Sequence, residues 1–341
     1  MRVTRDSLLR LARETAQERA YNQSDIIAIY LIGSLRQEEP FLGHSTDIDL
    51  IIVHEARPAI GREIIPLPAD IHLDILHRAR ADYQSPRQLR LHPALGHELY
   101  DAMLLYERQP FFEFVQAGVR GGMEFNAPTT ICQRAFRLLS ESRKEWLELS
   151  DAPEWGAKEM NAWLEILTHV ANALMEMDGT QLTVRRFLSD FSRHLATLDL
   201  QDLLPAFLEL MGEFSTLLDE LAAWIPHWET DFQIAAQSAT RTGDLHPARL
   251  SYYLHGMRHY LEGGQPLFAL WPLMRTWTWA ALALPEDRRV HWNELMHHLG
   301  WAEKREERLS ALDRYLDRVQ VALETYAAQH GVNLDTLPPL L

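Results

Sequence analysis

The chain has 341 residues, with 48 acidic and 33 basic side chains and a formal net charge of −15. This surplus of negative charge, without any Lys/Arg-rich run, argues against a nucleic-acid polymer as partner, because gripping phosphate backbones requires a basic surface. The length predicts two domains.

Three further features bear on where the chain works. Its single cysteine, Cys132, excludes an intramolecular disulfide framework and favours a reducing cytoplasm. The start, Met1 to Asn22, is amphipathic and charged, which is not the pattern of a secretory signal. No stretch approaches eighteen apolar residues, so we expect a cytoplasmic protein without a membrane span.

The first 110 residues alternate between helical and strand-like patterns. Apolar side chains recur along one side of 6–20, as in an amphipathic helix. Short apolar or alternating runs predict strands, and Pro93 opens a short helical piece. The expected strands are 26–32, 48–54, 69–77 and 101–107, with a short one at 63–67, and the helical piece is 93–99. The pattern predicts a mixed α/β core over 1–110.

After Pro110 the pattern becomes helical throughout, and no alternating Val/Ile-rich run remains. We therefore expect an all-helical domain over 111–341, and an α+β fold class for the whole chain. It would consist of a bundle over about 125–235 and an extension over about 245–330, joined near 235–246. The predicted helices are 129–150, 153–177, 183–197, 203–224, 250–263, 266–284 and 303–329.

Three aspartates stand out in the α/β part. Gly33-Ser34 ends the first apolar run, and Asp47 and Asp49 open the next, thirteen residues after Ser34. Because side chains alternate along a strand, these two carboxylates share a face and lie about 7 Å apart or less. They repel each other unless a cation lies between them, and Mg²⁺ is the natural oxygen-liganded ion. Asp74, in a later alternating run, completes the predicted cluster.

This order of residues resembles the nucleotidyltransferase superfamily that includes DNA polymerase beta. The family pattern is an apolar strand, Gly-Ser, a spacer, Asp-x-Asp and a later third carboxylate, matched here by Gly33, Ser34, Asp47, Asp49 and Asp74. The resemblance implies that the three aspartates hold two Mg²⁺ ions around a nucleoside triphosphate, with ATP the expected donor. It also implies that the Gly-Ser turn meets the outer phosphates.

Further candidates lie outside this pattern. Arg36 follows the Gly-Ser turn closely and is a candidate contact for the triphosphate. Glu154 and Lys158 are four residues apart, so a helix over 153–177 would place them one turn apart on one face. From spacing alone, a surface ion pair is the favoured interpretation of these two residues.

A narrower resemblance is to the kanamycin nucleotidyltransferase group of aminoglycoside-modifying enzymes. Gly33 to Gln37 (GSLRQ) is similar to that group's first motif, and Glu154-x-x-x-Lys158 followed by Asn161 is similar to an element of its helical domain. The resemblance implies that Glu154 is the general base and Lys158 a phosphate contact. It further implies a homodimer and a small, polar or cationic hydroxyl acceptor such as an aminoglycoside.

We therefore expect a Mg²⁺-dependent enzyme that transfers a nucleoside monophosphate to such an acceptor and releases pyrophosphate. Two alternatives remain open from the sequence. One is an enzyme that adenylylates proteins, as in toxin–antitoxin systems. The other is a nucleotide-binding module without catalytic activity.

Overall fold

The structure is a computed structural model, and it describes residues 3–238, 243–301 and 304–337, without the side chains of 215, 216 and 336. The chain forms two compact units. The first comprises Met1–Phe125 and Ala248–Gly256, and the second Asn126–Pro247 and Met257–Leu341. In the described part of the chain, no helix combines the length and apolarity needed to cross a bilayer.

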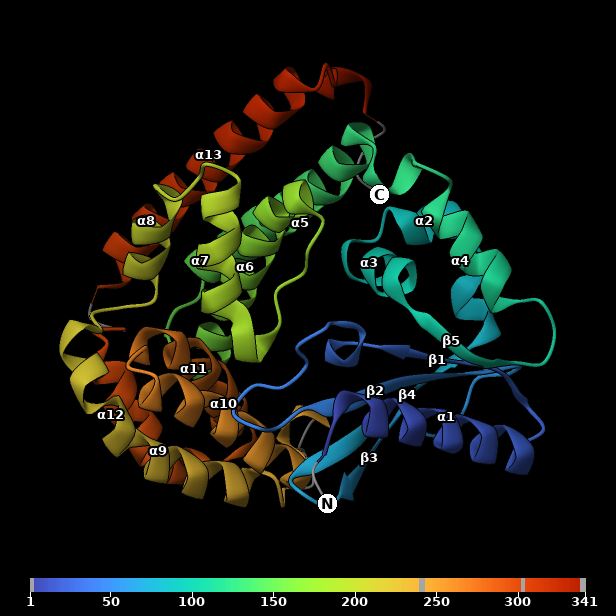
Figure 1. The fold of residues 1–341 in the computed structure, drawn as a ribbon. Coiled ribbons are helices and arrows are strands. Elements are labelled where there is room, and N and C mark those ends of the chain that lie inside the picture. Colours follow the sequence, from blue (N-terminus) through green and yellow to red (C-terminus); the bar gives the residue numbers. More distant parts are fainter. Residues whose placement is uncertain (1–2, 239–242, 302–303, 338–341) are drawn as a thin grey trace. The chain divides into compact units, whose positions relative to one another are not determined.

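The first unit is built on a mixed five-stranded sheet (Figure 1), as the sequence predicts. The strand order is β3-β4-β2-β1-β5. The central pair, β2 and β4, is parallel, and the other neighbours are antiparallel. The strands are β1 Ile26–Ile32, β2 Asp47–His54, β3 Arg62–Leu67, β4 Ile71–Ala79 and β5 Met103–Glu107.

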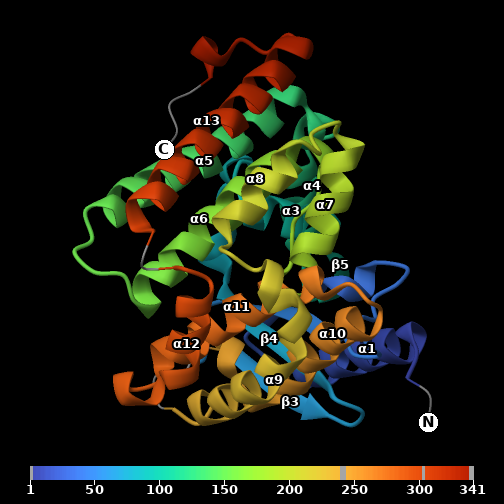
Figure 2. The same cartoon turned by 90° about the vertical axis from the view of Figure 1, so that its left-hand side faces the viewer.

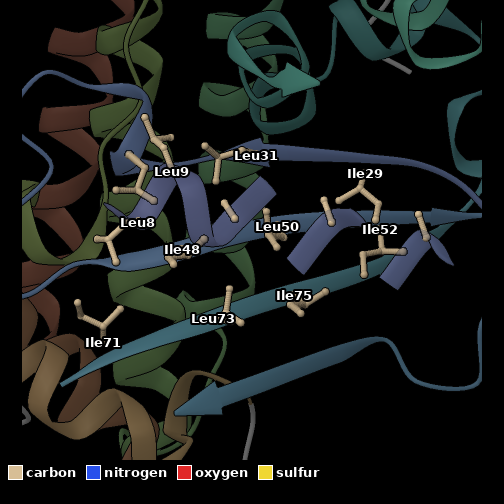
Figure 3. Packing of buried hydrophobic residues seen from close by; sticks show 14 of the residues in the cluster. Leu8, Leu9, Ile29, Leu31, Ile48, Leu50, Ile52, Ile71, Leu73 and Ile75 are labelled. Carbon is tan, nitrogen blue, oxygen red and sulfur yellow. The ribbon is translucent and has the colours of Figure 1, made fainter. Parts of the chain in front are cut away.

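Helix α1 (Arg5–Asn22) covers one face of this sheet (Figure 3). Thr4 caps it, because its hydroxyl accepts a hydrogen bond from the Ser7 amide at 3.2 Å. Every second residue of β2 and β4 belongs to the core beneath the helix, since strand side chains alternate between faces. These residues are Ile48, Leu50, Ile52, Ile71, Leu73 and Ile75. The intervening residues, including the three aspartates, therefore point to the opposite face.

The opposite face is covered by helices α2 (Pro86–Arg90), α3 (Pro93–Asp101) and α4 (Phe112–Arg120) (Figure 1). Phe112 stacks on Tyr30 of β1 with 4.3 Å between ring centroids. The first unit therefore extends beyond the expected limit at residue 110, because α4 buries its apolar side against the sheet. No helix was predicted at α2 or α4, since both are short.

The second unit is helical, in agreement with the predicted fold class. Helix α13 runs alongside α5, and α5 packs against α6 (Figure 2). An aromatic core lies within the unit, where Phe187 and Trp271 stack with ring centroids 3.7 Å apart. Its helices are α5 Pro128–Ser150, α6 Ala157–Met175, α7 Phe187–Thr197, α8 Leu203–Leu210, α9 Ser215–Ala235, α11 Pro266–Ala283, α12 Val290–His298 and α13 Arg305–Gln329. Helix α10 (Leu250–Glu262) begins in the first unit and ends in the second.

The helical region departs from the prediction around Gly212 and at α12. The single helix expected over 203–224 is two helices, α8 and α9, separated at Gly212. Gly212 has φ +118° and sits against the Leu299 backbone, so the chain turns where a side chain would not fit. Helix α12 was missed altogether. Positions 239–242 of the expected connection, and position 303, lie outside the described residues.

Candidate active site

The strand register brings the three predicted aspartates together. Across the parallel pair β2 and β4, Asp49 lies opposite Asp74 and Asp47 lies opposite His72. Adjacent strands are about 4.8 Å apart, so the three carboxylates form one cluster on one face. Asp47 and Asp74 are each 4% exposed, and Asp49 is half-buried.

The turn after β1 closes against this cluster. Gly33 has φ +76° and ψ −159°, a conformation available in practice only to glycine. A Cβ on Gly33 would lie 2.0 Å from Oδ2 of Asp49, so the glycine lets the turn approach that carboxylate. The next residue, Ser34, shares a hydrogen bond with the hydroxyl of Thr46 at 2.8 Å. The turn therefore sits beside the carboxylates and is joined to the start of β2.

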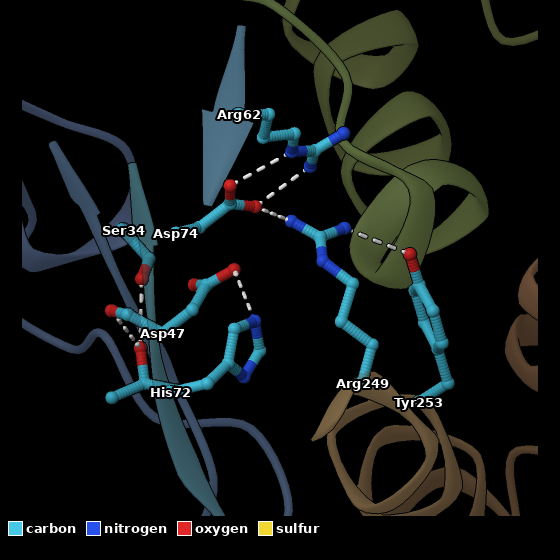
Figure 4. Close-up of polar contacts among 8 residues, drawn as sticks. Ser34, Asp47, Arg62, His72, Asp74, Arg249 and Tyr253 are labelled. Atoms are coloured by element: carbon cyan, nitrogen blue, oxygen red, sulfur yellow. Dashed lines mark hydrogen bonds and ion pairs between the residues drawn. The ribbon is translucent and has the colours of Figure 1, made fainter. Parts of the chain in front are cut away.

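Asp74 is held by two arginines (Figure 4). Arg62 of β3 donates from Nε to Oδ1 at 2.8 Å and from Nη2 to Oδ2 at 2.7 Å. Arg249, just before α10, also donates from Nη2 to Oδ2. Burial by itself would raise the pKa of Asp74, but the hydrogen bonds from Arg62 and the charge of Arg249 outweigh it and lower the pKa. Asp74 is therefore ionised and neutralised by the protein itself.

The charge that the protein leaves uncompensated is at Asp47 and Asp49. Burial, together with the nearby charges of Asp47 and Asp74, raises the pKa of Asp49 well above its usual value. Beside Asp47, the Nε2 atom of the buried His72 lies 4.0 Å from Oδ2 (Figure 4). The His72 ring meets the ring of Tyr252 edge-on, with centroids 5.3 Å apart. An additional cation next to Asp47 and Asp49 would relieve the repulsion at Asp49.

The donor set fits a Mg²⁺ ion bound through Asp47 and Asp49. Magnesium is usually held by one or two carboxylates together with substrate phosphates, rather than by a cage made only of protein groups. Within 3–238, 243–301 and 304–337, no group of three or more His, Cys, Asp or Glu side chains is arranged to hold a metal ion. The role of Asp74 as a third ligand stays a prediction, because two guanidinium groups occupy its oxygens here.

The other predicted residues lie elsewhere. Arg36 follows the turn, as expected, but its Nε donates to the carbonyl oxygen of Asp101. Glu154 and Lys158 belong to the second unit, and both are exposed. Their roles as general base and phosphate contact stay predictions.

The prediction that Glu154 and Lys158 lie one turn apart on one face of the same helix was wrong. Helix α6 begins at Ala157, so Glu154 lies in a bend before it and only Lys158 lies in its first turn. The helix starts there because the carboxylate of Glu159 accepts a hydrogen bond from the Gly156 amide at 3.0 Å. Ser150 and Asp151 lie at the end of the preceding helix, α5.

Sequence reasoning missed both arginines of the cluster. Arg62 could have been found, because Ile64 lies opposite Asp74 and Arg62 is its neighbour on the same face of β3. Arg249 is 175 residues from Asp74 along the chain, and no local pattern connects the two.

No protein-family model matches the chain, and no curated protein matches it significantly. One similar solved structure is that of a nucleotidyltransferase-like protein from Exiguobacterium sibiricum. The two chains are 14% identical, with 95% of this chain and 92% of that chain covered and a TM-score of 0.28. At these values the likeness carries no argument about chemistry, which has to come from the carboxylate cluster itself.

Proposed function

We propose that this protein is a nucleotidyltransferase that moves a nucleoside monophosphate from a nucleoside triphosphate, with ATP the first candidate, to a hydroxyl group of a small acceptor. The observation that carries the proposal is the cluster of Asp47, Asp49 and Asp74 beside the Gly33-Ser34 turn. Buried like charges are costly to hold together unless a cation is bound among them. A short glycine turn supplies backbone N–H groups that suit a phosphate.

The proposed reaction is an in-line displacement at the α-phosphorus. The acceptor oxygen forms a bond to phosphorus while the bond from phosphorus to the β-phosphate oxygen breaks, and pyrophosphate leaves. Bound Mg²⁺ would supply positive charge for the phosphates and orient them. Asp47 and Asp49 would hold that ion, and the turn at Gly33 and Ser34 would seat the outer phosphates.

In this proposal, Glu154 takes the proton of the acceptor hydroxyl and Lys158 contacts the phosphate. Both side chains are exposed and therefore accessible to substrates. Removing a positioned general base typically lowers a rate about 10²- to 10⁴-fold. Glu154→Gln should therefore keep Mg²⁺–ATP binding and lose transfer, while Glu148→Gln, at an exposed carboxylate that pairs with Lys144, should keep both.

The acceptor class is proposed to be a small polar or cationic molecule, for which aminoglycosides are the first panel to test. The net charge of −15 favours cations over polyanions as partners. Incubation with α-labelled ATP and the panel, followed by chromatography, identifies a small product. A parallel incubation with cell lysate, followed by gel separation, tests the alternative in which proteins become labelled.

The site itself is tested by isothermal titration of Mg²⁺ with a non-hydrolysable ATP analogue. Asp47→Asn/Asp49→Asn should weaken metal-dependent binding at least tenfold, about 1.4 kcal/mol. The matched control is Glu55→Gln, because Glu55 follows the other end of β2 and forms an exposed ion pair with Arg80. Equal metal-dependent binding by the double variant and the wild type would refute the proposed function.

A further inference from the structure

The carboxylate of Asp74 is nearly saturated by protein donors. An ionised carboxylate offers about four lone-pair sites, and three N–H groups from Arg62 and Arg249 are directed at Asp74 (Figure 4). Asp74 is also 4% exposed. A metal ion could bind this carboxylate only if at least one guanidinium group left it.

Arg249 is held in place rather than loosely paired. The residue is 8% exposed, and its Nη1 donates to the phenol oxygen of Tyr253 at 3.0 Å. Its guanidinium also lies 5.9 Å from the ring centroid of Tyr252. A buried guanidinium fixed by a second hydrogen bond and an aromatic ring has little freedom to swing away, in contrast to a surface ion pair.

The formal charges of the three carboxylates and the two guanidinium groups do not cancel. Three ionised carboxylates carry −3, and Arg62 and Arg249 together carry +2, which leaves −1. Both guanidiniums donate hydrogen bonds to Asp74, so the remaining negative charge is at Asp47 and Asp49.

We propose that Arg249 takes the place of a second metal ion, so that the site binds a single divalent cation, at Asp47 and Asp49, with a permanent protein cation at Asp74. This inference rests on the proposed function and revises the expectation of two Mg²⁺ ions. Arginine suits the role, because its guanidinium stays charged at any physiological pH and matches a carboxylate in geometry. Arg249 is thus a positioning residue that keeps Asp74 from acting as a metal ligand.

The test counts bound metal directly and does not depend on activity. Free Mn²⁺ is measured by electron paramagnetic resonance as the full-length protein is titrated with and without a non-hydrolysable ATP analogue. The variants are Arg249→Met, Asp74→Asn and the Arg249→Met/Asp74→Asn double variant. The matched control is Arg19→Met, because Arg19 forms a half-buried ion pair with Glu63 on the same sheet, away from the aspartates. Circular dichroism checks that each variant is folded.

The expected result is one Mn²⁺ ion per chain for the wild type, for Asp74→Asn and for Arg19→Met. Arg249→Met should bind two ions, because it removes one of the two guanidinium groups that occupy Asp74, and the double variant should return to one. Asp74→Asn keeps the inference falsifiable even if Arg249→Met does not fold, because its count must equal that of the wild type.

Three other outcomes would overturn the inference, and they differ in their consequence. Two ions on the wild type, with one lost in Asp74→Asn, would show that Asp74 is a metal ligand, and the proposed function would survive. If the wild type and a folded Arg249→Met bind the same number of Mn²⁺ ions, Arg249 does not take the place of a second metal ion. No Mn²⁺ on any variant, even with the nucleotide analogue, would refute the proposed function and this inference together.

Discussion

Replacing Gly33 with alanine tests the claim that the turn is shaped around the carboxylate of Asp49. Gly33 has φ +76° and ψ −159°. An added Cβ would lie 2.0 Å from Oδ2 of Asp49, a distance that real Cβ contacts do not show, and 3.0 Å from Cγ of the same residue. Gly33→Ala must therefore strain the backbone and push the Asp49 side chain aside.

The cost can be worked out from the two effects. A non-glycine residue in this backbone region costs about 1–3 kcal/mol. For a unit of this size, roughly 4 °C of melting temperature is lost per kcal/mol, so we expect a fall of roughly 4–12 °C. Displacing Asp49 should in addition weaken Mn²⁺ binding, since this carboxylate is one of the two proposed to hold the ion.

Substitutions at two other glycines distinguish the effect of backbone strain from the effect of displacing the Asp49 side chain. Gly179 has φ +69° and no atom near an added Cβ, so Gly179→Ala should cost about 1–2 kcal/mol of strain and leave Mn²⁺ binding intact. Gly61 has neither a positive φ nor a neighbour within 4 Å, so Gly61→Ala should change stability by less than about 0.5 kcal/mol. Melting curves and Mn²⁺ titrations are measured on all three. Equal melting temperatures for Gly33→Ala and Gly61→Ala, with full Mn²⁺ binding by both, would refute the reasoning.

Two further predictions concern buried charge. A carboxyl group whose folded pKa is raised, as at Asp49, contributes stability that is fully present below its unfolded pKa of about 3.9 and is lost as pH rises through the folded value. In chelator, Asp49→Asn should therefore melt higher than the wild type at neutral pH, and this gain should shrink as pH falls toward 4; a gain that does not depend on pH would contradict this. In the second unit, Arg134 and Glu176 form an ion pair with side chains 0% and 2% exposed, so Arg134→Met should cost about 3–5 kcal/mol by removing one partner of a buried ion pair. Arg318→Met, which removes an exposed pair with Asp202, should cost less than about 1 kcal/mol in the same denaturant titration, and similar losses for both variants would argue against the role of burial.

Much of the first unit could be predicted from the sequence, because its elements are defined by local patterns. Apolar runs set the strands within about two residues, and the alternation of side chains placed Asp47 and Asp49 on one face. The third aspartate joined them because β4 pairs with β2 in parallel, although the sequence alone suggested only a neighbouring strand. Local periodicity is a property of short segments, so a single sequence carries it.

In the helical part, several helix boundaries depend on contacts that the local sequence pattern does not show. The start of α6 at Ala157 depends on a hydrogen bond from the Gly156 amide to Glu159, and the break before α9 depends on the fit of Gly212 against Leu299. Apolar periodicity continues through both places, and the pattern therefore predicted helices that are too long. Helix α4 was not predicted, because it is short and its apolar side becomes evident only where it packs against the sheet.

By itself, the sequence determined the mixed sheet, the helical character of the second unit, and the three aspartates with the glycine turn beside them. Only the tertiary structure decided how the charges of that cluster are balanced. Arg249 reaches Asp74 across 175 residues of chain, and its partner Tyr253 fixes it there. The physical reason is that electrostatic pairing depends on distance in space, which periodicity along the chain does not encode.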